Sequence, residues 1–118
     1  MSLVIASRVV SGVVIIDVSG RLCVLEHELS PYIKRLLEEG YREIILNLAE
    51  LSYVDSSGLG QLISVWTLIK EKAGSLILFR PTGHVKTLLQ MTKLDTVFHT
   101  TEDAQTIENP RMHFAAVN

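Results

Sequence analysis

Two runs of mostly β-branched apolar residues open the chain, over residues 3–10 and 13–18. They are joined across Ser11-Gly12, and a two-residue joint of this kind between two such runs predicts a β-hairpin. Gly20 follows the second run and is expected to end its strand. The chain is therefore predicted to begin with two antiparallel strands.

A first helix is predicted after this hairpin, once the chain has crossed residues 21–28. Ser30 and Pro31 suit the N-cap and the first helical position, although an earlier start near Glu26 stays open. Gly40 is typical of a residue that ends a helix. The side chains expected to face the sheet recur at helical spacing: Tyr32, Ile33, Leu36 and Leu37.

Strands and helices alternate through the rest of the chain. Strands are predicted over residues 43–48, 75–79 and 96–99, and a helix is predicted after each of them. The element order β-β-α-β-α-β-α-β-α predicts an α/β sandwich with mixed pairing, in which one antiparallel hairpin is followed by crossover connections.

The last predicted helix opens near Thr101 with residues typical of a capping box. Asn109-Pro110 should break this helix, which leaves residues 111–118 as a tail that is either loose or docked on the surface. The predicted division is therefore a domain over residues 1–110 and a C-terminal tail over residues 111–118.

The junction between the 43–48 strand and the next helix is the most informative stretch. Asp55 suits the N-cap of this central helix, which places Ser56 and Ser57 in its first turn. Gly58 and Gly60 each cost about 1 kcal/mol relative to Ala in a helix interior. They also leave the backbone bare, so that another surface can approach closely. The apolar residues of the central helix that are expected to face inward are Leu59, Leu62, Ile63, Trp66 and Ile69.

Three interpretations of this junction can be compared. An ordinary helix cap is the simplest. A serine-hydrolase elbow fits poorly, because it needs glycine two residues before and two residues after the serine, and Val54 stands at the first of these places around Ser56. A phosphate-binding loop of the Walker type fails, because Gly-Lys-Ser/Thr is absent. Beyond a plain cap, the junction offers an exposed hydroxyl that another protein can modify.

Composition narrows the class of protein. The chain has 118 residues, 47% of them apolar and 20% charged, which is typical of one globular domain. A formal charge of −2 gives no electrostatic reason to expect direct nucleic acid binding. The single cysteine, Cys23, cannot form an internal disulfide, and no apolar run approaches the about 18 residues of a membrane helix. With no signal-peptide pattern at its start, the chain is expected in the cytoplasm without membrane insertion.

No constellation of residues predicts catalysis or metal binding. The four histidines show no ligand spacing with one another or with Cys23. The sequence also lacks an acid–base pair or a nucleophile with its base. We therefore expect neither an enzyme, nor a metal site, nor a cofactor. The polar side of the central helix is expected to be solvated and could form part of a partner surface: Gln61, Ser64, Thr67 and Lys70.

Several of these segments together resemble the STAS domains, and within them the bacterial anti-sigma-factor antagonists. The most specific segment is Asp-Ser-Ser-Gly-Leu-Gly at residues 55–60 in its strand-to-helix setting, and residues 46–48, 74–76 and 85–94 add to it. The resemblance covers roughly residues 3 to 108. It implies a STAS-like single domain with a mixed sheet of four or five strands packed against helices.

The resemblance also implies a partner-switching function. In this family the serine directly after the aspartate is phosphorylated by an anti-sigma factor that is a serine kinase, and that serine corresponds to Ser56. The unphosphorylated antagonist binds the kinase and frees the sigma factor, and a metal-dependent serine phosphatase resets it. The partner-binding residues implied here are Asp55, Ser56, Ser57, Gly58, Leu59, Gly60 and Gln61.

One turn departs from the family pattern. The family often has a Gly-Glu-Leu-Asp turn after the second strand, whereas Gly20-Arg21-Leu22-Cys23 reverses one charge and loses the other. A STAS scaffold that is not phosphorylated, in a signalling assembly or associated with transport, is therefore an alternative. An enzyme or small-ligand binder is the competing class, which a deep polar pocket beside Asp55 would favour.

Overall fold

The computed structural model describes residues 3–24 and 27–117, with side-chain surroundings up to residue 114. The strands are β1 (Leu3–Val10), β2 (Val13–Leu22), β3 (Glu43–Asn47), β4 (Leu51–Val54), β5 (Ser75–Phe79) and β6 (His99–Thr101). The helices are α1 (Leu29–Glu38), α2 (Ser56–Glu71), α3 (Gly83–Met91), the 3₁₀ helix η1 (Leu94–Thr96), α4 (Gln105–Glu108) and α5 (Pro110–Val117).

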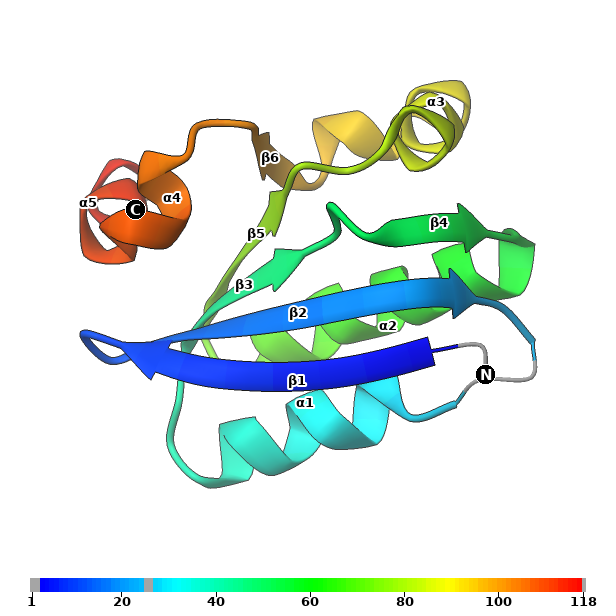
Figure 1. The fold of residues 1–118 in the computed structure, drawn as a ribbon. Helices are drawn as coiled ribbons and strands as arrows, with labels where there is room; N and C mark the ends of the chain where they lie inside the picture. The colour runs from blue at the N-terminus through cyan, green and yellow to red at the C-terminus, as the bar shows by residue number, and fades with distance from the viewer. Residues whose placement is uncertain (1–2, 25–26, 118) are drawn as a thin grey trace.

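These strands form one mixed sheet in the order β1-β2-β3-β5-β6, with β4 paired to the end of β2 (Figure 1). The β1–β2 pair is antiparallel and the other neighbouring pairs are parallel. The α/β class and the hairpin across Ser11-Gly12 are confirmed, but the described residues form six strands rather than four or five. The sequence pattern misses β4, because this strand has only four residues and two of them, Ser52 and Tyr53, are polar and not buried.

Strand β2 continues through Gly20 to Leu22, so the prediction that Gly20 ends this strand is wrong. Gly20 has a φ of +98°, and the register of β2 against β4 shifts between Gly20 and Arg21. Before this irregularity β2 pairs with β3, and from Gly20 onward it pairs with β4. Gly20 therefore allows a bulge inside the strand, which a residue without a Cβ can adopt at little cost.

Helix α1 begins at Leu29, so Ser30 is its second residue and not its N-cap. Pro31 remains compatible with the first turn, where a backbone N–H has no partner within the helix. The alternative start near Glu26 lies outside the described residues. Gly40, with a φ of +102°, follows the end of the helix as predicted. On the predicted inward stripe, Ile33 and Leu37 are buried, and Tyr32 and Leu36 are partly buried.

The last strand, β6, begins at His99, three residues later than the predicted strand at 96–99. Lys93 adopts a φ of +61° and leads into η1, which occupies Leu94–Thr96. Phe98 follows this turn and is buried against the main core. The apolar pair Val97-Phe98 suggested a strand, but Phe98 instead anchors the turn that precedes β6.

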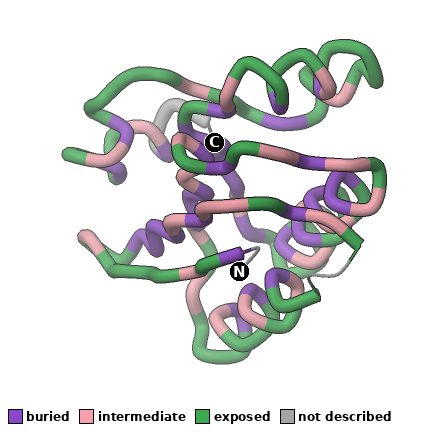
Figure 2. The backbone as a smooth tube through the Cα atoms, turned by 45° about the vertical axis from the view of Figure 1, so that its right-hand side comes forward, coloured by how far each residue is buried: buried purple, intermediate pink, exposed green. Residues whose placement is uncertain are grey.

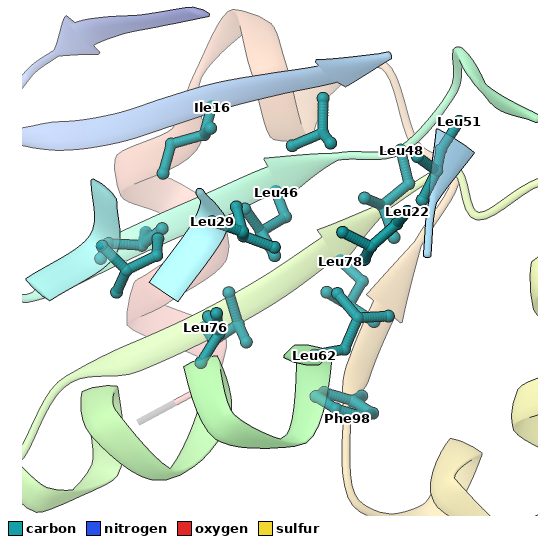
Figure 3. Close-up of a cluster of buried hydrophobic side chains, with 14 of the residues drawn as sticks. Ile16, Leu22, Leu29, Leu46, Leu48, Leu51, Leu62, Leu76, Leu78 and Phe98 are labelled. Atoms are coloured by element: carbon teal, nitrogen blue, oxygen red, sulfur yellow. The ribbon is translucent and has the colours of Figure 1, made fainter. Parts of the chain in front are cut away.

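Helices cover both faces of the sheet, and each face has its own apolar cluster. The larger cluster lies between the sheet and helices α1, α2 and α3 (Figure 3). Figure 2 shows the buried positions gathered along the strands and on the helix faces that turn toward them. The smaller cluster lies on the opposite face, where α5 contributes the fully buried Phe114 against Val13, Ile15, Ile45, Ile77 and Phe79.

Most of the predicted tail forms helix α5, after the expected break at Asn109-Pro110. Its Arg111 forms an ion pair with Glu43 and also donates a hydrogen bond to the carbonyl oxygen of Ser11 at 2.9 Å. Of the two alternatives for the tail, the structure therefore shows a docked one, while Asn118 lies outside the described residues. Within residues 3–24 and 27–117, no helix is long and apolar enough to span a membrane.

The docking of α5 can be tested by removing its buried aromatic ring. Replacing Phe114 with Ala should lower the free energy of unfolding by about 3 kcal/mol or more, because the side chain is fully buried. Met112→Ala is the matched control on the same helix, since Met112 is 66% exposed, and it should change stability by less than about 0.5 kcal/mol. Urea unfolding followed by circular dichroism measures both, and equal effects would contradict the docked arrangement.

Candidate functional site

The junction between β4 and α2 has the geometry predicted for a capped helix start. Asp55 is extended, with a φ of −96°, and directly precedes the helix. Its Oδ1 accepts a hydrogen bond from the backbone N–H of Gly58 at 2.7 Å, and its carbonyl oxygen accepts from the N–H of Leu59 at 2.9 Å. Asp55 therefore satisfies one of the first-turn N–H groups that a helix leaves without a partner. The N-cap prediction is confirmed.

The two serines of the first turn differ in exposure. Ser56 is exposed, whereas Ser57 is half-buried. Neither hydroxyl makes a hydrogen bond within the part of the chain that the structure describes. The hydroxyl of Ser56 is therefore the more accessible of the two to another molecule.

The two glycines of this segment have opposite surroundings. A Cβ placed on Gly58 would lie 2.1 Å from the carbonyl oxygen of Leu22, at the end of β2. A Cβ placed on Gly60 would meet nothing within 4 Å. The prediction that bare backbone at Gly58 serves an approaching partner is therefore wrong, because the surface that approaches Gly58 is β2 of the same chain. Gly60 does present bare backbone to the exterior.

The other residues of the predicted partner-binding set also separate into inner and outer positions. Leu59 is 8% exposed and belongs to the main core. Gln61 is half-buried, and its Nε2 donates to the carbonyl oxygen of Cys23 at 3.1 Å, which ties α2 to the turn after β2. The buried Oε1 of Gln61 has no partner among the described residues. The exposed part of the set is thus Ser56 and Gly60, flanked by the partly exposed Asp55, Ser57 and Gln61.

The inward face of α2 differs from prediction at one of its positions. Leu62 and Ile69 are buried and Trp66 packs against the core, but Ile63 is 39% exposed. Val65 is fully buried in its place. Gly58, Leu62, Val65 and Ile69 recur at helical spacing and form the buried row. Because Gly58 has no apolar side chain, the hydrophobic pattern did not mark it as the first residue of this row.

A stack of three side chains beside this junction could not be found from the sequence. The Arg21 guanidinium lies 4.2 Å from the centre of the Tyr53 ring, a cation–π distance, and Tyr53 stacks on His84 with ring centres 5.5 Å apart. His84 Nε2 also lies 3.2 Å from the carbonyl oxygen of Val54. The stack depends on the pairing of Arg21 with Tyr53 across β2 and β4, and β4 was the unpredicted strand.

The described residues offer no metal site at this junction. Across the described parts of the chain, no three His, Cys, Asp or Glu side chains gather in a way that could hold a metal ion. A hydrogen bond from Lys86 and the charge of that ammonium group lower the pKa of Glu102. That pair joins α3 to the segment after β6.

Residues 4–107 match the family model of the STAS domain. The chain is 32% identical over 88 residues to the anti-sigma F factor antagonist of Paenibacillus polymyxa, which covers 70% of this chain and 73% of that protein. It is 26% identical over 78 residues to the anti-sigma-B factor antagonist of Staphylococcus aureus, with 66% and 72% covered.

Solved structures share the fold. The anti-sigma factor antagonist SpoIIAA of Bacillus, in its unphosphorylated form, superimposes with a TM-score of 0.67 at 24% identity over 92% of this chain and 96% of SpoIIAA. Its phosphorylated form gives a TM-score of 0.69 at 23% identity over 89% and 97%. At these sequence identities, the similarity shows that this chain and SpoIIAA share the same arrangement of strands and helices.

The cap can be tested by removing its acceptor oxygen. Replacing Asp55 with Ala should lower the free energy of unfolding by about 0.5–2 kcal/mol, because the N–H of Gly58 loses its acceptor. Asp55→Asn keeps an acceptor oxygen at the same place and should lose less. Chemical unfolding of the three proteins checks this, and an Asp55→Ala variant as stable as the parent would show that the hydrogen bond contributes nothing.

The two glycines offer a matched pair of substitutions within one helix. Gly58→Ala should destabilise the fold by about 1–3 kcal/mol or more, because its methyl group would overlap the Leu22 carbonyl. Gly60→Ala should stabilise it by up to about 1 kcal/mol, since Ala favours a helix and the space is open. Thermal unfolding measures both changes, and a stable Gly58→Ala variant would contradict the close contact between α2 and β2.

Proposed function

This chain belongs to the STAS-domain family, and on that premise we propose that it is an anti-sigma factor antagonist switched by phosphorylation of Ser56. It is a regulatory binding protein and not an enzyme, as its relatives' names suggest. Its proposed partner is an anti-sigma factor that is also a serine kinase, and a serine phosphatase restores the unmodified form. The proposed location of this exchange is the cytoplasm.

The observation that most supports this proposal is the exposed hydroxyl of Ser56 on a capped helix start. A kinase must bring the γ-phosphate of ATP into line with the attacking oxygen, which requires an accessible hydroxyl. Ser56 is exposed and makes no hydrogen bond with the described residues, whereas Ser57 is half-buried. The Asp55 carboxylate fixes the turn from which Ser56 projects. The Ser56 hydroxyl is therefore both accessible to a kinase and held in a fixed turn.

The proposed partner-binding surface is the exposed part of the 55–61 segment. Ser56 and Gly60 lie one helical turn apart, so they belong to the same side of α2. The bare backbone at Gly60 allows a partner to approach closely. Gly58 and Leu59 contribute from inside, because they hold this turn against β2 and the core. Asp55, Ser57 and Gln61 form the rim of the surface.

Phosphorylation should act on the interface and leave the fold unchanged. A phosphoryl group adds about −1.5 to −2 charges at pH 7. The N-terminus of α2 favours this charge by roughly 0.3–1 kcal/mol, and repulsion from Asp55 opposes it by a similar, screened amount. Burying the group against a partner without a matching cation costs several kcal/mol, and about 3 kcal/mol already weakens binding about a hundredfold. The phosphate therefore has little net effect within the domain but a large cost at the interface, so the partner is released.

A scaffold that is not phosphorylated is the second candidate. The observation that favours it is the exposed cation of Arg21 at the end of β2, which lies over the Tyr53 ring. The family pattern often has an acid at this place. A changed charge beside the junction suits a different partner. In that case the same surface would bind constitutively, and Ser56 would accept no phosphate.

The two candidates differ in a phosphorylation assay. We expect a kinase-type anti-sigma factor from the same organism, supplied with ATP, to add one phosphate that peptide mass mapping locates to Ser56. Ser56→Ala should abolish this uptake, while the control Ser57→Ala should keep it. Phosphate uptake by Ser56→Ala at the parental rate would overturn the site, and no uptake with any such kinase would favour the scaffold.

Binding to the same anti-sigma factor tests the electrostatic switch. Ser56→Asp should bind about a hundredfold more weakly than the parent, because its charge also enters the interface. Ser56→Ala should bind as the parent does and should not be released by ATP. Titration calorimetry gives both affinities, and equal binding by Ser56→Asp and the parent would contradict the switch.

A further inference from the structure

Strand β1 forms one edge of the sheet, and no other strand of the described residues pairs with its outer side. Its eight residues pair only with β2, and no other backbone hydrogen bond reaches them from the described residues. Proteins usually protect such an edge with Lys, Pro or a bulge. Strand β1 has none of these, and its one charge, Arg8, is paired with Asp17 of β2. Val4 and Val9 are about half exposed along it, at 51% and 50%.

A groove runs beside this free edge. It has a volume of about 410 Å³ and is lined by Ile5, His27, Glu28, Pro31, Tyr32 and Arg35. One wall is therefore β1 and the other is the first two turns of α1. The Ser7 and Tyr32 hydroxyls are 2.6 Å apart and hold the strand and the helix at one level. A strand added to β1 would place alternate side chains over this groove.

The sequence of β1 is complementary to itself in one antiparallel register. With Ser7 opposite the partner's Ser7, Ile5 faces the partner's Val9, and Val4 faces the partner's Val10. Arg8 faces the partner's Ala6, so like charges do not meet. Directly opposite residues of an antiparallel pair point to the same face of the sheet. Since the paired positions differ by an even number of residues, the α1 side of one copy lies on the same face of the extended sheet as the α1 side of the other.

Two charged residues of the groove, Glu28 and Arg35, would also face each other's opposite charge in a two-fold symmetric dimer. Glu28 and Arg35 lie two helical turns apart, about 10 Å along α1, and neither forms an ion pair with a described residue. Helix α1 runs parallel to β1, because it connects the parallel strands β2 and β3. A two-fold axis at Ser7, level with Tyr32, therefore sets the two copies of α1 antiparallel and places Glu28 opposite the partner's Arg35.

We propose that this chain forms a symmetric dimer in which β1 pairs antiparallel with β1 of a second copy, and Glu28 of each copy pairs with the partner's Arg35. The dimer leaves the start of α2 accessible, because β4 and β1 pair with opposite edges of β2. Each dimer thus presents two Ser56 sites. This interface is independent of whether those sites are phosphorylated.

Charge exchange across the interface gives a direct test. Sedimentation velocity of the full chain over a range of concentrations should show a reversible monomer–dimer equilibrium. Arg35→Glu alone and Glu28→Arg alone should each raise the dimer dissociation constant about tenfold or more, because they oppose like charges twice. The double variant E28R/R35E should return it close to the parental value. Lys34→Glu is the matched control, since Lys34 lies on the side of α1 that faces Leu68 and Glu71 of α2.

Two results would overturn the proposal. One is a monomer at every concentration up to about 1 mM. The dissociation constant of any dimer would then exceed about 1 mM, which is too weak an affinity for a specific interface. The other is a dimer whose dissociation constant Arg35→Glu leaves unchanged. Hydrogen exchange of the parent protein gives a second measurement that needs no substitution: β1 amides should exchange more slowly at high concentration than at low concentration, and equal rates would also overturn the dimer.

Discussion

The contact between Gly58 and the Leu22 carbonyl fixes the position of α2 against the sheet. Only a residue without a Cβ fits there, since a methyl group would lie 2.1 Å from that oxygen. The contact sets the first turn of α2 directly on the end of β2, and the Asp55 side chain then completes the turn by accepting from the Gly58 N–H. Leu59 and Leu62 enter the core from the same turn and the next one. Exposure of Ser56 follows from this placement, because the opposite side of the turn is occupied.

This arrangement separates the stability of the domain from its chemistry. The side of the first turn that faces inward is fixed by close packing, where a single added carbon is costly. The side that faces outward has the exposed Ser56 and, at Gly60, a glycine with open space around it. The proposed change of charge would fall on this side. The chain shares its arrangement of strands and helices with both the unphosphorylated and the phosphorylated structure of SpoIIAA.

The features that could be predicted from the sequence are those set by local chemistry. The Ser11-Gly12 hairpin, the stop at Gly40 and the Asp55 cap each depend on residues adjacent in the chain, and the structure confirms them. The errors arise where distant segments decide. Gly20 looked like a strand end because its bulge exists only in register with β4, and Gly58 looked exposed because Leu22 is far away in sequence. The Arg21–Tyr53–His84 stack joins three elements and has no signal in any one of them.

A phosphate on Ser56 is proposed to change the surface of this domain and not its fold. The most direct test is to incorporate phosphoserine at position 56 during synthesis and to measure the binding affinity for the anti-sigma factor together with the unfolding temperature. We predict an affinity about a hundredfold lower than that of the unmodified chain, with the unfolding temperature changed by only a few degrees. An unchanged affinity, or a loss of binding that accompanies unfolding of the domain, would contradict the account.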